Sequence, residues 1–195
     1  FAPDGKQLVG GGADGTIRIY ETDTGRETGL LAGHYSRVIA ATMSPDGRYV
    51  LSSSFDSRVV LWDLAAARPV RTIDATRGPA RSLLPIAGGG EFLVGGQDGS
   101  LRKWREDGGG EAPFLLHTGP AVAQLVAAPD GARALAIRQD GSAVLIDARS
   151  GFQLATFEGA FGPDIGPKLG AIQPFSPDES RFVTLEGPSA TVFRR

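Results

Sequence analysis

Short apolar runs separated by polar turns occupy most of the chain. The segments TIRIYE at 16–21 and SLRKWR at 100–105 alternate apolar and polar residues, as expected for strands with one buried face. The run VVLWDL at 59–64 is apolar nearly throughout, which is expected where neighbouring sheets cover a strand on both faces. The runs are about six residues long and have no helical period, so they predict an all-β fold.

One layout of turn and strand recurs along the chain. Its centre is an aspartate that returns every 42 residues, at Asp14, Asp56, Asp98 and Asp140. A second marker lies between these aspartates, at APDG 2–5, SPDG 44–47, AGGG 87–90, APDG 128–131 and, after a longer interval, SPDE 176–179. Pro, Asp and Gly favour tight turns, so both markers separate strands, and about four strands fit in one repeat.

Four-stranded units of this size cannot bury both of their faces alone. They must therefore stack side by side, and radial stacking gives a β-propeller. The repeats are expected at roughly 1–34, 35–76, 77–118, 119–160 and 161–195.

The segments SPDGRYVLSSSFDSRVVLWD and LLAGH resemble the WD-repeat (WD40) β-propeller family. The repeat of that family has a Gly-His pair, a strand, an SPDG turn, a strand, an Asp turn and a strand ending in Trp-Asp. The resemblance extends over nearly the whole chain. It implies four-stranded antiparallel blades in a partial ring, with about 4.7 blades in this chain.

The resemblance also implies a buried hydrogen-bond relay in the second repeat. The residues that match its members are His34, Ser52, Asp56 and Trp62. The other repeats depart from this set and are expected to have incomplete relays, because other residue types stand there: Gly10, Tyr20, Val94 and Ile146. The fifth repeat has neither the Asp turn nor the Trp-Asp pair.

Charge and composition narrow the partners and the chemistry. The formal net charge is −2, so we expect neither a nucleic-acid nor a membrane partner. The chain has no Cys and two widely separated His residues, so we expect no metal site and no cofactor. Seventeen Arg against three Lys indicate a bacterial genome rich in G and C. The sequence does not indicate a cellular compartment.

Two patterns could suggest an enzyme. GGGADG at 10–15 satisfies the spacing of a dinucleotide loop, but such a loop opens a helix, and a strand pattern follows here. His34, Ser52 and Asp56 have the residue types of a catalytic triad, yet a Trp in the same relay favours a structural role. A hydrolase with its chemistry in the central channel is a third possibility, but VIAATM, RSLLP and VAQLV offer no acid, base or nucleophile cluster there. We therefore expect no catalytic residue.

The resemblance implies that partners bind where the loops after His34 and the Asp turns gather. Aromatic and Arg side chains are typical anchors of such surfaces. The candidate partner-binding residues are Tyr35, Arg37, Phe55, Arg77, Gln97 and Gln139. The predicted function is a non-catalytic scaffold that presents this face to a protein or peptide. The alternative is an accessory or sensor domain of a larger bacterial enzyme, as in a kinase, cytochrome or peptidase fusion.

Overall fold

Antiparallel strands make up all the regular structure in the described part of the chain. A computed structural model describes residues 1–74, 77–86, 88, 90–105, 115–117, 119–128, 131–159, 181–186 and 189–194. Within these ranges, no helix is long and apolar enough to cross a membrane.

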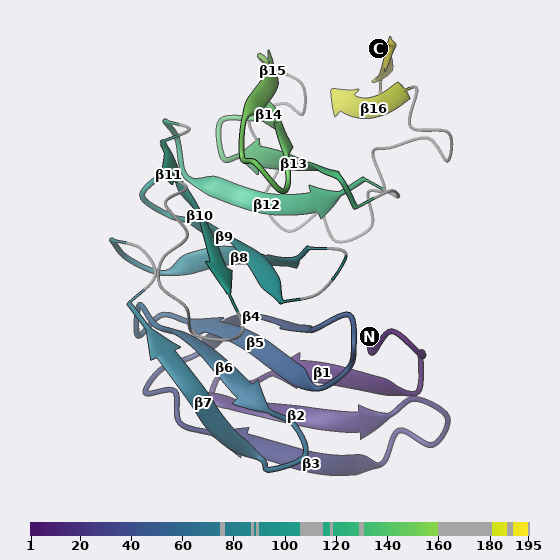
Figure 1. The fold of residues 1–195 in the computed structure, drawn as a ribbon, viewed down its shortest axis with the longest axis vertical. Helices are drawn as coiled ribbons and strands as arrows, with labels where there is room; N and C mark the ends of the chain where they lie inside the picture. The colour runs from purple at the N-terminus through teal and green to yellow at the C-terminus, as the bar shows by residue number, and fades with distance from the viewer. Residues whose placement is uncertain are drawn as a thin grey trace.

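The strands form successive antiparallel sheets (Figure 1). The first sheet has three strands: β1 (Gln7–Gly11), β2 (Thr16–Glu21) and β3 (Glu27–Ala32). The second has four: β4 (Val38–Met43), β5 (Tyr49–Ser54), β6 (Val59–Asp63) and β7 (Arg68–Ile73). The third comprises β8 (Ala80–Pro85), β9 (Glu91–Gly96), β10 (Ser100–Arg105) and β11 (Leu115–His117). The fourth comprises β12 (Val122–Ala127), β13 (Arg133–Arg138), β14 (Ala143–Asp147) and β15 (Gln153–Phe157).

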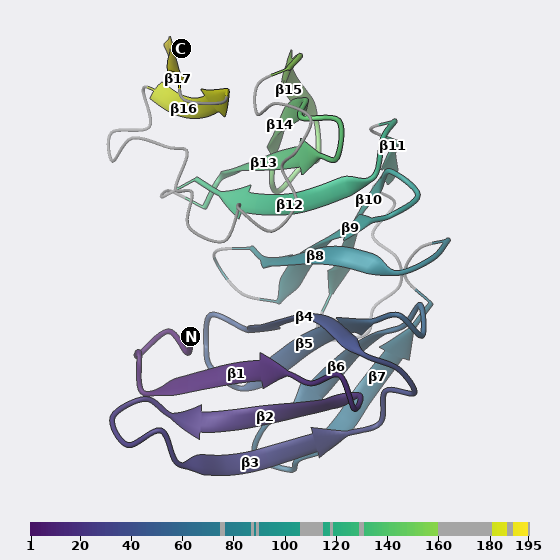
Figure 2. The ribbon, with the colours of Figure 1, turned by 180° about the vertical axis from the view of Figure 1, so that it is seen from behind.

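A hairpin of β16 (Arg181–Glu186) and β17 (Ser189–Arg194) follows the fourth sheet. The predicted first strand of the fifth repeat and its SPDE turn at 176–179 lie outside the described residues. The sheets follow one another in chain order, and β4, β8 and β12 lie one after another along the stack (Figure 2). The described sheets do not close into a ring. This arrangement confirms the predicted four-stranded antiparallel blades and the partial ring.

Local turn chemistry explains where strands begin and end. In the SPDG turn, the amide of Gly47 donates to the carbonyl of Ser44 (2.9 Å), and a carboxylate oxygen of Asp46 accepts the amide of Arg48 (3.0 Å). Gly47 has a φ of 73°, a left-handed conformation that side chains disfavour. The turn therefore reverses the chain between β4 and β5.

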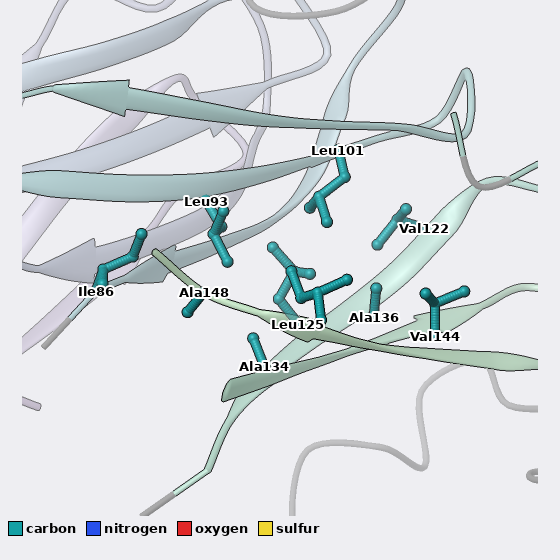
Figure 3. Close-up of a cluster of buried hydrophobic side chains, with 10 residues drawn as sticks. Ile86, Leu93, Leu101, Val122, Leu125, Ala134, Ala136, Val144 and Ala148 are labelled. Carbon is teal, nitrogen blue, oxygen red and sulfur yellow. The ribbon is translucent and has the colours of Figure 1, made fainter. Parts of the chain in front are cut away.

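Apolar side chains hold the sheets face to face. On β6, Val60 and Trp62 join the cluster shared with the first sheet, whereas Val59 and Leu61 join the cluster shared with the third. All four are buried. The prediction that this strand is covered on both faces is therefore confirmed. The next interface, between the third and fourth sheets, has Leu101 and Leu93 on one side and Val122 and Leu125 on the other (Figure 3).

Small residues face larger ones where adjacent sheets meet. A Cβ on Gly11 of β1 would lie 2.5 Å from Cγ1 of Val38 on β4. The same relation recurs between the third and fourth sheets, where a Cβ on Gly95 would lie 2.6 Å from Cγ1 of Val122. Neither distance leaves room for a methyl group, so the glycines permit the close approach of the sheets.

Candidate functional site

Four side chains of the second repeat form a continuous chain of hydrogen bonds. Nε1 of Trp62 on β6 lies 2.8 Å from Oγ of Ser52 on β5. The same oxygen lies 2.7 Å from Nε2 of His34, which belongs to the connection between β3 and β4. Nδ1 of His34 lies 2.9 Å from a carboxylate oxygen of Asp56 in the turn between β5 and β6. The structure thus brings together the four residues that the sequence singled out for a relay.

One arrangement of protons satisfies every member. The indole of Trp62 can only donate, so Ser52 accepts from it. The hydroxyl proton of Ser52 then remains to be donated to Nε2 of His34, and Nδ1–H of the neutral imidazole donates to Asp56. The Trp62 and His34 rings also meet edge to face, with centroids 6.0 Å apart. A Cβ on Gly33 would lie 3.0 Å from the Trp62 ring, which explains a glycine before the histidine.

The carboxylate of Asp56 ties two connections together. Burial raises its pKa, but donors from the amides of Tyr35 (3.0 Å) and Arg58 (2.9 Å) and from His34 outweigh burial and hold the pKa below its ordinary value. The group is therefore a carboxylate at neutral pH. It fixes the β3–β4 connection against the β5–β6 turn.

The same turn carboxylate recurs in other sheets with different partners. Asp98 accepts the amide of Arg77 (2.9 Å) and both the amide and the hydroxyl of Ser100. Asp140 accepts the amide and hydroxyl of Ser142. Burial raises the pKa of Asp98, yet these donors bring the pKa below its ordinary value. In each case the hydrogen bonds close a tight turn.

The third sheet shows what happens where the relay serine is absent. Val94 stands 42 residues after Ser52, and Trp104 stands 42 residues after Trp62. Nε1 of Trp104 is buried and has no hydrogen-bond partner among the described residues. The guanidinium of Arg71 lies 5.9 Å from the centroid of the indole. Packing and the contact with Arg71 therefore hold this Trp in place of a relay hydrogen bond.

The six candidate partner-binding residues are all exposed. They lie in the β3–β4 and β7–β8 connections and in the turns that contain the central aspartates. Equivalent backbone bonds align these segments in three successive sheets: Phe55 N to Arg37 O (3.1 Å), Gln97 N to Pro79 O (3.1 Å) and Gln139 N to Ala121 O (2.9 Å). Tyr35 is 80% exposed and Phe55 is 51% exposed. We call this end of the sheets the loop face.

Arg58 is a loop-face residue that was not predicted. Its guanidinium carbon lies 4.9 Å from the centroid of the Tyr35 ring. The sequence does contain a signal that Arg58 is unusual. In the three other repeats, the residue two positions after the turn aspartate has a hydroxyl that bonds to that aspartate: Thr16, Ser100 and Ser142. Arg58 breaks this pattern.

The two enzyme-like sequence patterns have structural roles here. GGGADG joins two antiparallel strands, and Asp14 closes the turn by accepting the amide of Thr16 (3.1 Å), so the segment does not open a helix. Ser52 is fully buried and bonded on both sides, so its hydroxyl does not face a substrate space. Across the described ranges, no three His, Cys, Asp or Glu residues group as metal ligands.

Comparison with known proteins places these features in a family. The family model described as "WD domain, G-beta repeat" matches residues 1–21 and 25–63. The chain is 30% identical over 165 residues to Transducin beta-like protein 3 of Bos taurus, an alignment that covers 77% of this chain and 21% of that protein.

Two further relatives are similar over shorter stretches. WD repeat-containing protein 1 of Xenopus tropicalis is 40% identical over 75 residues, covering 37% of this chain and 12% of that protein. Target of rapamycin complex subunit wat1 of Schizosaccharomyces pombe is 32% identical over 106 residues, covering 53% of this chain and 33% of that protein. The chain thus spans a third or less of the length of these relatives. They are eukaryotic, and the bacterial origin indicated by residue usage stays a prediction. The matches agree with the stacked four-stranded antiparallel sheets, and the chain belongs to the WD40 repeat family.

Proposed function

We propose that the chain is a non-catalytic scaffold that presents the loop face to a protein or peptide partner. The carrying observation is the exposure of Tyr35 and Phe55 on segments held by backbone and carboxylate bonds. Exposed aromatic rings on a fixed backbone frame are suited to binding, because little backbone freedom is lost when a partner covers them.

The relatives support a role in assembly. One of them is named as a subunit of the target of rapamycin complex, so its name describes a part of an assembly. The net charge of −2 supports a protein or peptide partner over nucleic acid or an anionic membrane. No enzymatic activity is part of the proposal.

Site-specific photocrosslinking in the full-length protein tests the proposal. Benzoylphenylalanine placed at Phe55 should form crosslinks to a partner in the native cell. The control is the same group placed at Val70, which has similar exposure (48% against 51%) but lies on the strand β7. Equal crosslinking from both positions, or from Val70 alone, would place the binding surface elsewhere.

A further inference from the structure

We infer that the loop face of the second sheet binds an acidic peptide segment, with Asp or Glu side chains meeting arginines and an apolar side chain meeting Tyr35 and Phe55. This inference rests on the proposed function, because it names the chemical class of the partner for the same face. The arginines involved are Arg37 and Arg58, with Arg77 on the next connection.

The aromatic part of this surface is held in place. The amide of Tyr35 donates to Asp56, and the amide of Phe55 donates to the carbonyl of Arg37. The two bonds join the β3–β4 connection to the β5–β6 turn. Both rings are therefore presented from neighbouring segments whose spacing is fixed.

The arginines of this surface are not neutralised by the chain itself. Arg37, Arg58 and Arg77 form no ion pair with any carboxylate in the described ranges. Arg18, by contrast, lies 2.8 Å from Asp14. The guanidinium of Arg58 instead covers the Tyr35 ring at 4.9 Å, a cation–π contact that leaves its N–H groups available at the ring edge.

The carboxylates near these arginines are mostly occupied. The side chain of Asp56 is 7% exposed and accepts three donors, and Asp98 accepts the amide of Arg77 together with Ser100. Asp74 on the β7–β8 connection is also exposed. Asp56 and Asp98 keep their negative charges, but hydrogen-bond donors engage their oxygens. The guanidinium groups of these three arginines have no carboxylate partner in the described ranges, so they can pair with the carboxylates of a ligand.

Arg58 is not needed to build the turn in which it stands. At the equivalent position the other sheets use a hydroxyl that bonds to the turn aspartate. In the second sheet the carboxylate of Asp56 is instead hydrogen-bonded to the backbone amide of Arg58 and to the imidazole of His34. The half-buried arginine side chain is therefore not required by the turn, and its guanidinium, stacked on Tyr35, can also take part in recognition.

A peptide with one or two carboxylates fits this chemistry better than a nucleic acid. Guanidinium groups bind carboxylates through paired hydrogen bonds, and exposed aromatic rings accept an apolar side chain. Nucleic acid binding depends on many phosphate contacts, and this surface offers three cations on an acidic chain.

Selection from a randomised dodecapeptide library, with all amino acids equally represented, tests the inference on the full chain. Selected peptides should be enriched in Asp and Glu beside an apolar residue. Replacing their Glu by Gln and Asp by Asn should weaken binding measured by fluorescence anisotropy, and the loss should shrink as salt rises from about 50 to about 300 mM. Arg37→Gln and Arg58→Gln should each weaken binding by up to about fivefold.

Arg68→Gln is the matched control, because Arg68 is exposed at the opposite end of the same sheet, paired in register with Asp63. It should leave affinity and acid enrichment unchanged. An unchanged melting temperature of Arg37→Gln would show that its effect is on binding.

Other outcomes separate this inference from the proposed function. If the selected peptides are not enriched in Asp and Glu, but their binding is lost in Phe55→Ala, the inference of an acidic peptide ligand is overturned. The proposed function would still stand. Binding only to phosphorylated peptides, to single-stranded RNA or to anionic vesicles would overturn it as well. Peptides insensitive to Phe55→Ala and to both arginine variants would contradict both proposals. If the library yields no binder, the inference is overturned. The crosslinking experiment then decides on the proposed function.

Discussion

The indole nitrogen of Trp62 lies 2.8 Å from the hydroxyl oxygen of Ser52, and this bond begins the relay that ends at Asp56. The next residue, Ser53, is equally buried, but its hydroxyl has no partner among the described residues. Two adjacent serines in one strand therefore have opposite hydrogen-bonding states.

Ser52→Ala should destabilise the protein by about 1–3 kcal/mol, because it leaves Trp62 and His34 with unpaired buried nitrogens. Ser53→Ala should be neutral or stabilising by up to about 1 kcal/mol, because it removes a hydroxyl that is buried without a partner. Urea unfolding of the two variants measures both free energies. Equal losses would show that burial of the serine matters and the relay does not.

Trp62→Ala should lower the free energy of unfolding by about 3–5 kcal/mol through lost packing and a cavity. Phe55→Ala should leave the melting temperature almost unchanged, since the ring is 51% exposed, and should weaken partner capture. Thermal scans measure the stability of both variants, and co-precipitation of the crosslinked partner compares its capture by Phe55→Ala and by the wild type. A large drop in melting temperature for Phe55→Ala would assign that ring to the core.

Gly11→Ala should destabilise the contact between the first and second sheets by about 1–3 kcal/mol, because its methyl group would lie 2.5 Å from Val38 Cγ1. The control is the neighbouring Gly10→Ala, whose nearest contact would be an ordinary 3.8 Å from the Tyr20 ring. Combining Gly11→Ala with Val38→Ala should give a smaller loss than the sum of the two single losses. A strictly additive pair would show that the contact does not limit packing.

Stability should fall in acid. The pKa of Asp98 lies below its ordinary value near 3.8 in the folded protein, because its hydrogen bonds outweigh burial. The carboxylate therefore contributes stability above about pH 4, and this contribution is lost as pH falls through the folded pKa. Asp98→Asn should lose less free energy of unfolding between neutral pH and pH 3 than the wild type, by roughly 0.2–1 kcal/mol because solvent screens the group.

Asp23→Asn serves as the control for that measurement. Asp23 is exposed in the β2–β3 turn, and in the described part of the chain its carboxylate accepts no hydrogen bond. The Asp23→Asn variant should lose as much free energy of unfolding in acid as the wild type. An Asp98→Asn protein with the same acid loss as the wild type would contradict the stabilising role of this carboxylate.

The strands and turns were predictable because their causes are local. Asp56 and Asp98 bond to amides two residues on, so a 42-residue spacing of such residues marks the hairpins directly. The Arg58 contact with Tyr35 was not predicted, because it joins two connections whose distance depends on the packed sheets. The sequence signal for this contact was Arg58 itself, which stands where the other repeats have Ser or Thr. The close approach of Gly11 to Val38 likewise depends on how the sheets stack, and the sequence shows only a glycine in a strand.

The turn carboxylates hold the neighbouring connection through its main chain. Asp56 accepts the amide of Tyr35, and Asp98 accepts the amide of Arg77, each 21 residues upstream. Every amino acid except proline supplies that amide. Tyrosine and arginine at these two places can thus be exchanged for other residues without loosening the framework. New partner preferences can evolve, or be engineered, on an unchanged scaffold.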